Sequence, residues 1–276
     1  MGAYTSLLLN GTYDYILDSG LDILRGGFPF AAYMMFAGSI PTVADCLIAI
    51  KRLVFEKKLY SVHQIKEAIR VNFDGYEAMR CQMAACPKFG NDIDEVDKLA
   101  ADIADHFCEW LNDYRNETGF AILPALLGWR FLEEAYGTAA TPDGRHYADP
   151  IAEHYCATPG KAVNGPTALI NSIAKAKETI KKAAGVCAVH VTLPRNLGNS
   201  TEESLAVLDG LVKAAIENGL NQMNMAIYDK ALLQKAQQDP ENHRDIIVRV
   251  WGYSARFVDL CKEMQDHVIS RVAGSV

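Results

Sequence analysis

The sequence predicts a helix-rich α/β protein that forms one compact unit. Amphipathic patterns fill most of the N-terminal half, whereas short apolar runs alternate with helical patterns in the C-terminal half, as in βα units. No fixed-period repeat and no low-complexity linker divides the 276 residues. We expect a mainly helical part over residues 1–150 and a βα part over residues 151–276.

Hydrophobic periodicity predicts the helices of the N-terminal half, which are expected over residues 12–24, 42–55, 62–71 and 91–114. The first should stop at Gly26 and Gly27. The last carries the longest apolar stripe, which runs from Ile93 through Trp110 to Tyr114, and its first turn is acidic, as the helix dipole favours. The apolar run 28–38 is too short to span a bilayer and is expected to be buried core.

Turn residues and apolar runs divide the C-terminal half. Residues 139–150 are dense in turn formers and predict a loop with a tight Pro-Asp-Gly turn. The expected helices are 165–182, 201–217, 229–237 and 259–271. The expected strands or extended segments are 186–193, 222–227 and 246–250.

The composition is that of an ordinary globular protein. Half of the residues are apolar, 22% are charged, and the net charge of −7 argues against nucleic acid or an anionic membrane as the partner. The N-terminus lacks the basic and apolar regions of a signal peptide, and the seven cysteines show no framework spacing. We therefore expect a cytoplasmic protein with reduced cysteines and no metal site.

General catalytic motifs do not identify a reaction. The chain has no dinucleotide-binding glycine motif, no phosphate-binding loop and no nucleophile elbow. His146 and His154 flank a loop without a third ligand, and His190 in an apolar run is expected to be a core residue. No carboxylate spacing singles out an acid–base pair.

One segment near the C-terminus resembles a known family. Val248–Phe257, with the sequence VRVWGYSARF, is similar to the radical-bearing loop of the glycyl radical enzymes. Further blocks resemble the same family in the same order, so that the resemblance covers essentially the whole chain: Pro41–Tyr60, Asn72–Asp97 with PKFGNDIDEVD, Ala140–Arg145 with ATPDGR, Gly165–Ser172 with GPTALINS, and Ala236–Arg249.

The resemblance implies a fold and a chemistry. The family folds as a ten-stranded barrel, of which this chain would be the C-terminal part, a half-barrel ringed by helices that ends in a glycyl radical domain at about residues 225–276. Two finger loops meet inside the barrel of such enzymes. One carries the radical Gly, and the other carries a Cys that gives up a hydrogen atom and then attacks the substrate.

Gly252 is the residue that the resemblance identifies as the catalytic radical store. A radical on an α-carbon is flat and delocalised into both neighbouring peptide groups, and only Gly has no side chain to crowd it. Arg249, Val250, Trp251, Tyr253 and Ser254 are expected to position the loop, although Trp251 departs from the small residue usual before the Gly.

Two aromatic residues are candidates for the substrate pocket. Trp129 and Phe131 lie in the segment that lines the pocket in dehydratase-like relatives, with ordinary core packing as the alternative. Asn224 is expected to brace the radical loop through its side chain.

The resemblance also implies partners. Family members are much longer, and none of the seven cysteines has the family's catalytic context. We therefore expect a small subunit of a split enzyme, with the catalytic Cys and Glu on a large subunit that also covers the open strand edges and apolar inner face of a half-barrel. Activation would come from a separate enzyme that uses S-adenosylmethionine and an iron–sulfur cluster.

The reaction expected from the resemblance is a dehydratase or C–N, C–C or C–S lyase reaction on a small polar molecule. It would take place anaerobically in the cytoplasm or within a bacterial microcompartment. Two alternatives remain open at this point: a radical-domain module that repairs an oxygen-damaged enzyme, and an inactive interaction relative.

Overall fold

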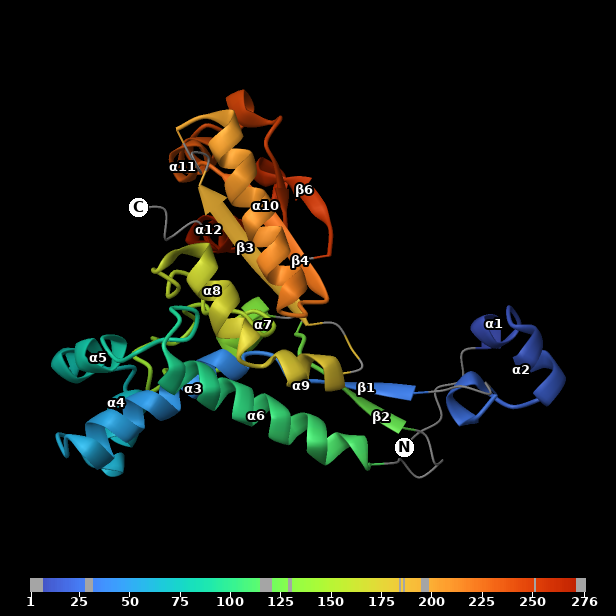
Figure 1. Ribbon diagram of the computed structural model, residues 1–276, viewed down its shortest axis with the longest axis horizontal. Coiled ribbons are helices and arrows are strands. Elements are labelled where there is room, and N and C mark those ends of the chain that lie inside the picture. The colour runs from blue at the N-terminus through green and yellow to red at the C-terminus, as the bar shows by residue number, and fades with distance from the viewer. Residues whose placement is uncertain are drawn as a thin grey trace.

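A computed structural model describes residues 7–27, 32–114, 121–128, 131–183, 185, 187–194, 199–250 and 252–271. Helices dominate, and α6 runs along the lower side of the molecule in Figure 1, with β3, β4 and α10 above it. The helices are α1 (Leu7–Asn10), α2 (Asp14–Ser19), α3 (Ile40–Ile50) with a π-helical continuation (Lys51–Glu56), α4 (Val62–Arg70), α5 (Glu77–Ala84), α6 (Asp94–Asn112), α7 (Phe131–Gly137), α8 (Gly165–Ala174), α9 (Lys177–Lys182), α10 (Thr201–Glu217), α11 (Lys230–Gln238) and α12 (Lys262–Arg271). Short 3₁₀ turns cover Ile23–Arg25, Pro240–His243 and Phe257–Asp259.

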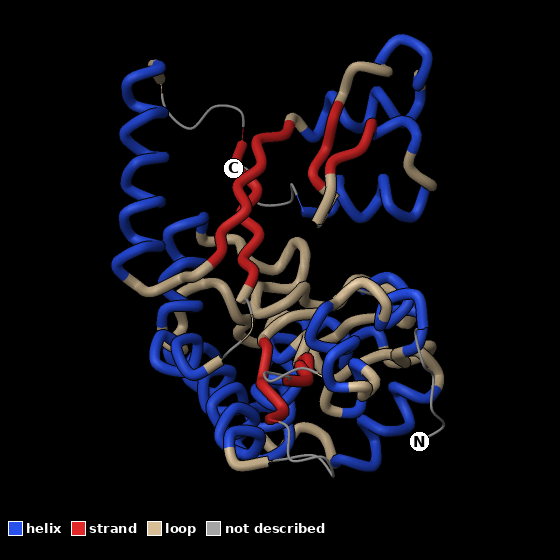
Figure 2. The backbone as a smooth tube through the Cα atoms, turned by 90° about the vertical axis from the view of Figure 1, so that its right-hand side faces the viewer, coloured by secondary structure: helices blue, strands red, loops and turns tan. Residues whose placement is uncertain are grey.

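The described strands pair two by two. The strands are β1 (Ala32–Phe36), β2 (Ala121–Ala125), β3 (Ala188–Pro194), β4 (Gln222–Tyr228), β5 (Ile247–Arg249) and β6 (Ser254–Arg256). β1 pairs with β2 and β3 with β4, both in parallel, whereas β5 and β6 form an antiparallel hairpin. The tube in Figure 2 shows these as separate pairs. The fold is therefore helix-rich α/β, as predicted.

Several sequence expectations need correction. The run 28–38 contains strand β1, and its successive residues Tyr33, Met34 and Met35 are 38%, 50% and 42% exposed instead of buried. The expected helix 12–24 is limited to α2, because the chain turns left-handed at Gly20. The helix expected over 165–182 is divided into α8 and α9, and the one expected over 259–271 becomes helical at Lys262. The elements α1, α5, α7, β2 and β6 were not predicted.

The main core lies where α3, α6, α8 and β3 meet. The stripe predicted on α6 is wrong at its C-terminal end, because Trp110 is 63% exposed and Tyr114 is 47% exposed. Val96 and Leu111 of α6 are buried beside small residues that let neighbouring elements approach closely: Ala100, Ala101, Ala104 and Cys108. Leu99, Ile103 and Phe107 of the same helix are only partly buried.

Polar side chains join two of the sequence blocks that resemble the family, PKFGNDIDEVD and GPTALINS. The Asn91 side chain donates to the carbonyl of Lys161 (2.8 Å) and accepts from the N–H of Val163 (2.8 Å). The Ser172 hydroxyl donates to Asp97 (2.7 Å), and burial raises the pKa of Asp97 to about 6. The segment around PKFGND is thus tied to the segment around GPTALINS, which explains these two blocks as structural.

The ATPDGR segment is a tight, buried loop. Thr141 and Arg145 form a β-bridge, and Gly144 takes a positive φ of 90°. The Arg145 guanidinium, in a residue that is 4% exposed, donates to the carbonyls of Asp149 (2.7 Å), Thr138 (3.1 Å) and Ala139. Arg145 therefore holds the loop together by satisfying its carbonyl groups, rather than by acting on a substrate.

Asp45 gives a testable pH dependence. Its carboxyl group is fully buried, and one oxygen accepts from the Phe89 N–H (2.7 Å) while the other has no hydrogen-bond partner among the described residues. Burial raises the pKa of Asp45 from 3.8 to about 8. Between those values the folded state binds the proton that the unfolded state has lost, so stability falls as pH rises.

We expect Asp45→Asn to flatten this part of the stability–pH curve, because the amide keeps the acceptor for Phe89 and cannot ionise. The substitution should reduce the slope of the free energy of unfolding against pH by up to about 1.4 kcal/mol per pH unit. Urea unfolding of the wild type and of Asp45→Asn, at several pH values between 3.8 and about 8, measures this slope. An Asp45→Asn protein with the slope of the wild type would show that Asp45 is ionised in the folded state.

Candidate functional site

The predicted radical loop is the tip of the β5–β6 hairpin. Ile247, Val248 and Arg249 pair with Arg256, Ala255 and Ser254, respectively. The N–H of Val250 donates to the carbonyl of Tyr253 at 2.9 Å, which closes the turn and leaves Gly252 at its tip. Trp251 lies outside the described residues. The sequence placed an extended segment here but did not predict the returning strand.

The tip of this hairpin is open. A β-carbon built on Gly252 would have no heavy atom of the described residues within 4 Å, apart from its neighbours in the chain. Tyr253 is 51% exposed, whereas Val250 is fully buried. Arg249 and Ser254 face each other across the hairpin, with 3.4 Å between Nη1 and Oγ. The hairpin is thus anchored through Val250 and presents Gly252 outward.

Two side chains hold the base of the hairpin. The hydroxyl of Tyr228, at the end of β4, accepts from the N–H of Arg249 at 2.6 Å. The guanidinium of Arg271, at the end of α12, donates through Nη1 to the carbonyls of Arg249 (3.2 Å) and Val250 (2.8 Å). Neither residue was a candidate in the sequence.

Arg271 is itself held by a buried carboxylate. Its Nε and Nη2 donate to the two oxygens of Glu153, at 2.9 Å each, and His267 bonds the same carboxylate. Glu153 is only 3% exposed. Burial raises the pKa of Glu153, but the charge of Arg271 and the hydrogen bond from His267 lower it more, so the net pKa lies well below the usual range. Glu153 is therefore ionised at neutral pH.

A chain of hydrogen bonds lies beside Glu153. The Gly128 N–H donates to His154 Nδ1 (3.3 Å), and His154 Nε2 lies 3.2 Å from His190 Nε2. The His190 Nδ1 atom is 3.3 Å from the Asn224 amide. Burial lowers the pKa of both imidazoles to about 4, so both are neutral at neutral pH.

The structure shows the surroundings of most of the other residues that the sequence singled out. Asn224 bonds His190, and the Tyr228 hydroxyl bonds the N–H of Arg249. The role of Asn224 as a brace of the radical loop stays a prediction. His190 is a satisfied core residue, as predicted. Phe131 is 1% exposed and packs edge-on against His154, with ring centroids 4.8 Å apart, which fits the core-packing alternative. Trp129 lies outside the described residues.

No cysteine of the described residues lies at the tip of the radical hairpin. Burial raises the pKa of the thiols of Cys46, Cys86, Cys108, Cys156 and Cys187. Cys81 and Cys261 are exposed. No thiol of the described residues lies within contact of the position above Gly252. The described residues also contain no group of three or more side chains that could hold a metal ion.

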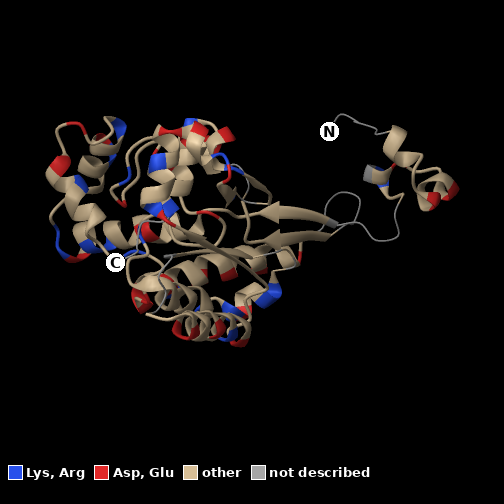
Figure 3. Ribbon diagram, turned by 90° about the horizontal axis from the view of Figure 1, so that it is seen from above, with Lys and Arg blue, Asp and Glu red and all other residues tan. Residues whose placement is uncertain are grey.

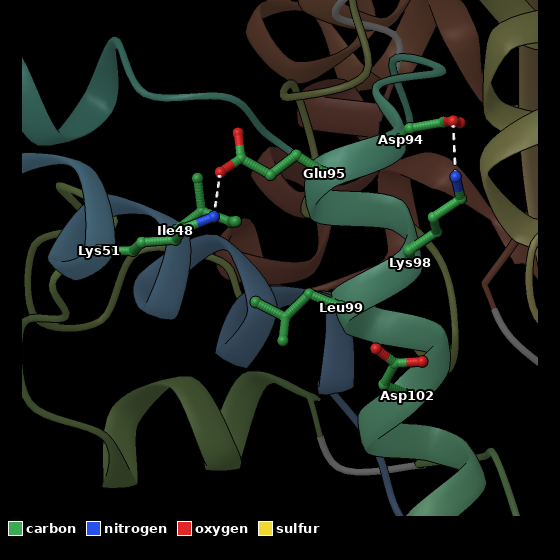
Figure 4. Close-up of a pocket in the computed structure, with 7 residues that line it drawn as sticks. All are labelled: Ile48, Lys51, Asp94, Glu95, Lys98, Leu99 and Asp102. Atoms are coloured by element: carbon green, nitrogen blue, oxygen red, sulfur yellow. Dashed lines mark hydrogen bonds and ion pairs between the residues drawn. The ribbon is translucent and has the colours of Figure 1, made fainter. Parts of the chain in front are cut away.

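The described pockets lie elsewhere. A pocket of about 380 Å³ between α3 and α6 is lined by Ile48, Leu99 and charged side chains. Figure 4 shows that two of its lysines already pair with carboxylates, Lys51 with Glu95 and Lys98 with Asp94, each at 2.8 Å. This pocket is a salt-bridged groove between two helices and contains none of the hairpin residues.

Comparison with known proteins relates the chain to one family. Residues 3–131 match the family model for pyruvate formate lyase-like proteins, and residues 151–258 match the glycine radical model. The chain is 32% identical to trans-4-hydroxy-L-proline dehydratase of Clostridioides difficile, over 96% of this chain and 33% of that protein. It is 30% identical to isethionate sulfite-lyase of Desulfovibrio desulfuricans, over 88% of this chain and 29% of that protein.

Solved structures agree with this relationship. Hydroxyproline dehydratase from Clostridioides difficile superposes with a TM-score of 0.85 at 28% identity, over 98% of this chain and 34% of that chain. A glycyl radical enzyme from Archaeoglobus fulgidus gives a TM-score of 0.84 at 32% identity, over 98% of this chain and 34% of that chain. The chain thus spans about a third of the length of the relatives it matches.

Proposed function

Because this chain belongs to the pyruvate formate lyase-like glycyl radical enzymes, in their dehydratase and lyase branch, we propose that it stores the radical on Gly252 and passes it to a Cys on a separate large subunit. The observation that carries the proposal is the open hairpin tip, where Gly252 has empty space on the side of a missing β-carbon. Such a position is accessible first to an activating enzyme and then to a reacting sulfur.

The proposed chemistry begins with the loss of one hydrogen atom from the α-carbon of Gly252. The oxidant is a carbon radical generated from S-adenosylmethionine on a separate iron–sulfur enzyme. The Cα of Gly252 later takes a hydrogen atom from a thiol S–H, which restores Gly and leaves the unpaired electron on sulfur. The backbone at the tip must remain planar across two peptide groups, and the anchored Val250 with the Arg249–Ser254 contact supports that geometry.

The reacting thiol is proposed to come from outside this chain. No thiol of the described residues lies within 4 Å of the position that a β-carbon of Gly252 would take, so none of them is placed to give a hydrogen atom to the tip. A large subunit with a Cys and a nearby Glu would supply the donor and most of the substrate pocket. The substrate class is a small polar molecule cleaved by a dehydratase or lyase reaction, in keeping with relatives named for trans-4-hydroxy-L-proline, isethionate and sulfopropanediol.

Exposed apolar surface supports a partner of this kind. β1 and β2 contain no charged residue, and Figure 3 shows them as an uncoloured pair that projects from a body with mixed charges. Successive residues of a strand point to opposite faces, and Tyr33, Met34 and Met35 are all exposed, so both faces of β1 are uncovered. A partner strand and helix packed on β1 would bury this surface.

Electron paramagnetic resonance tests the proposal. This chain, its candidate large subunit and an activating enzyme are combined anaerobically with S-adenosylmethionine. We expect an organic radical signal, split by the remaining α-hydrogen, that changes when the chain is labelled with deuterated glycine. Turnover of a dehydratase or lyase substrate should require the Cys-bearing subunit. A signal without turnover in the complete mixture would favour a repair module, and the absence of a signal would exclude radical storage here.

A further inference from the structure

The C-terminal unit, residues 229–271, packs largely on itself. Its apolar cluster consists of residues from this part of the chain: Leu233, Ala236, Val248, Val250, Phe257 and Val268. α11 packs against α12 and the adjoining 3₁₀ turns, and β5 pairs with β6. The main core cluster is built from other residues, between α3 and α10. The unit can therefore leave the body without opening the main core.

Apart from the bond between the Arg249 N–H and the Tyr228 hydroxyl, the side-chain hydrogen bonds that the structure gives between the described residues of this unit and of the body converge on Glu153. Arg271 and His267 both reach this carboxylate from α12, and Arg271 does so from 118 residues away in sequence. Glu153 and Arg271 have side chains that are 4% and 7% exposed, so solvent screens their attraction little. Such a pair is geometrically specific, and removing one partner leaves the other charge buried.

Arg271 connects this anchor directly to the radical loop. Its planar guanidinium uses Nε and Nη2 for the two oxygens of Glu153, while Nη1 serves the carbonyls of Arg249 and Val250. The second carbonyl lies two residues before Gly252. A lysine has one point charge and no rigid fork, so it cannot make both sets of bonds at once.

We propose that Glu153 is a positioning residue that acts through Arg271 as a latch, fixing the radical hairpin against the body when closed and freeing the C-terminal unit when broken. The role of this latch in activation and turnover rests on the function proposed for Gly252. Its effect on the position of the hairpin does not depend on that function. The closed latch orients the hairpin tip so that the radical on Gly252 can take a hydrogen atom from a thiol. In the assembled enzyme, where the proposed large subunit would cover the tip, the open latch lets Gly252 move out to the activating enzyme, so the ion pair balances activation against turnover.

Hydrogen–deuterium exchange of the full chain tests the latch without any radical chemistry. The probes are the backbone amides of Arg249, Val250 and Phe257, which donate to Tyr228, Tyr253 and Ile246. In Glu153→Gln we expect these amides to exchange at least tenfold faster, with amides of α6 unchanged. Arg271→Lys keeps a positive charge beside Glu153 and should accelerate the same amides by a smaller factor.

The matched control is Glu241→Gln. Glu241 forms an exposed pair with Arg244 in the same unit, at 2.7 Å and with side chains 75% and 59% exposed. In Glu241→Gln the amides of the β5–β6 hairpin should exchange at the wild-type rate. Unchanged hairpin exchange in Glu153→Gln would overturn the latch. So would equal acceleration in α6 in both Glu153→Gln and Arg271→Lys, because that result indicates loss of the whole fold.

The rate of radical formation gives a second readout that a merely structural role would not raise. With activating enzyme and the large subunit present, Glu153→Gln should form the signal severalfold faster than the wild type, and this assembled variant should turn over severalfold more slowly. A slower rise of the signal would contradict the latch. If the wild type forms no radical at all, the proposed function fails, while the exchange experiment still decides whether Glu153 holds the hairpin.

Discussion

Replacing Gly252 by alanine is expected to abolish the organic radical signal while the protein remains folded. A β-carbon at this position meets open space, and the residue lacks the positive φ that penalises side chains, so unfolding free energy should change by less than about 0.5 kcal/mol. The chemistry is more demanding than the fold, because a methyl group crowds the planar centre and blocks the close approach of a hydrogen-atom donor.

The measurement is a spin count after anaerobic activation, together with a thermal unfolding curve for each protein. Gly210→Ala is the matched control. Gly210 lies exposed in α10, a β-carbon there also meets open space, and the change should stabilise the helix by about 1 kcal/mol while keeping the full signal. A signal of wild-type size in Gly252→Ala would place the radical on another residue.

Replacing Gly144 by alanine should have the opposite profile, with severe loss of stability. A β-carbon on Gly144 would lie 2.8 Å from both the Ala84 nitrogen and the Arg80 carbonyl oxygen, which belong to the backbone of α5. The residue also has a φ of 90°, which L side chains rarely adopt. Strain and overpacking together should cost on the order of 3 kcal/mol or more, a large part of the stability of a typical domain.

Gly75→Ala separates these two causes. Gly75 has a φ of 75° but a β-carbon there meets nothing within 4 Å, so only backbone strain applies, and the expected loss is about 1 kcal/mol. Urea unfolding of the two variants measures the difference. If both lose the same free energy, the contact of the ATPDGR loop with α5 contributes nothing to stability, contrary to the packing described above.

Local patterns in the sequence predicted the elements that depend on neighbouring residues. The helix expected over 201–217 matches α10, which Ser200 caps, and the helix over 62–71 matches α4 to within a residue. The strands over 186–193 and 222–227 correspond to β3 and β4. In each case the apolar residues that recur periodically and the cap or turn residue lie within a few positions of one another. A short stretch of sequence is therefore enough to predict the element.

The candidate site was predictable only where a motif spans it. The position of Gly252 followed from the resemblance, but Tyr228, Glu153 and Arg271 were missed. The sequence did hint at a role for Arg271, because His267 and Arg271 lie four residues apart on one face of α12 and can therefore reach the same partner. Glu153 is in an irregular segment and gave no signal. The exposed aromatic residues of α6 were misassigned because periodicity shows that a face is apolar, without showing how near a neighbour comes.

The sequence by itself determined most of the longer helices, the strands β3 and β4, the family, and the glycine expected to carry the radical. Only the tertiary structure decided that a carboxylate in a loop meets a guanidinium 118 residues later, and that this guanidinium holds the backbone beside Gly252. The physical reason is range. Helix and strand formation depend on residues within a turn or two, whereas a buried ion pair needs two distant segments to be brought together by the packing of everything between them.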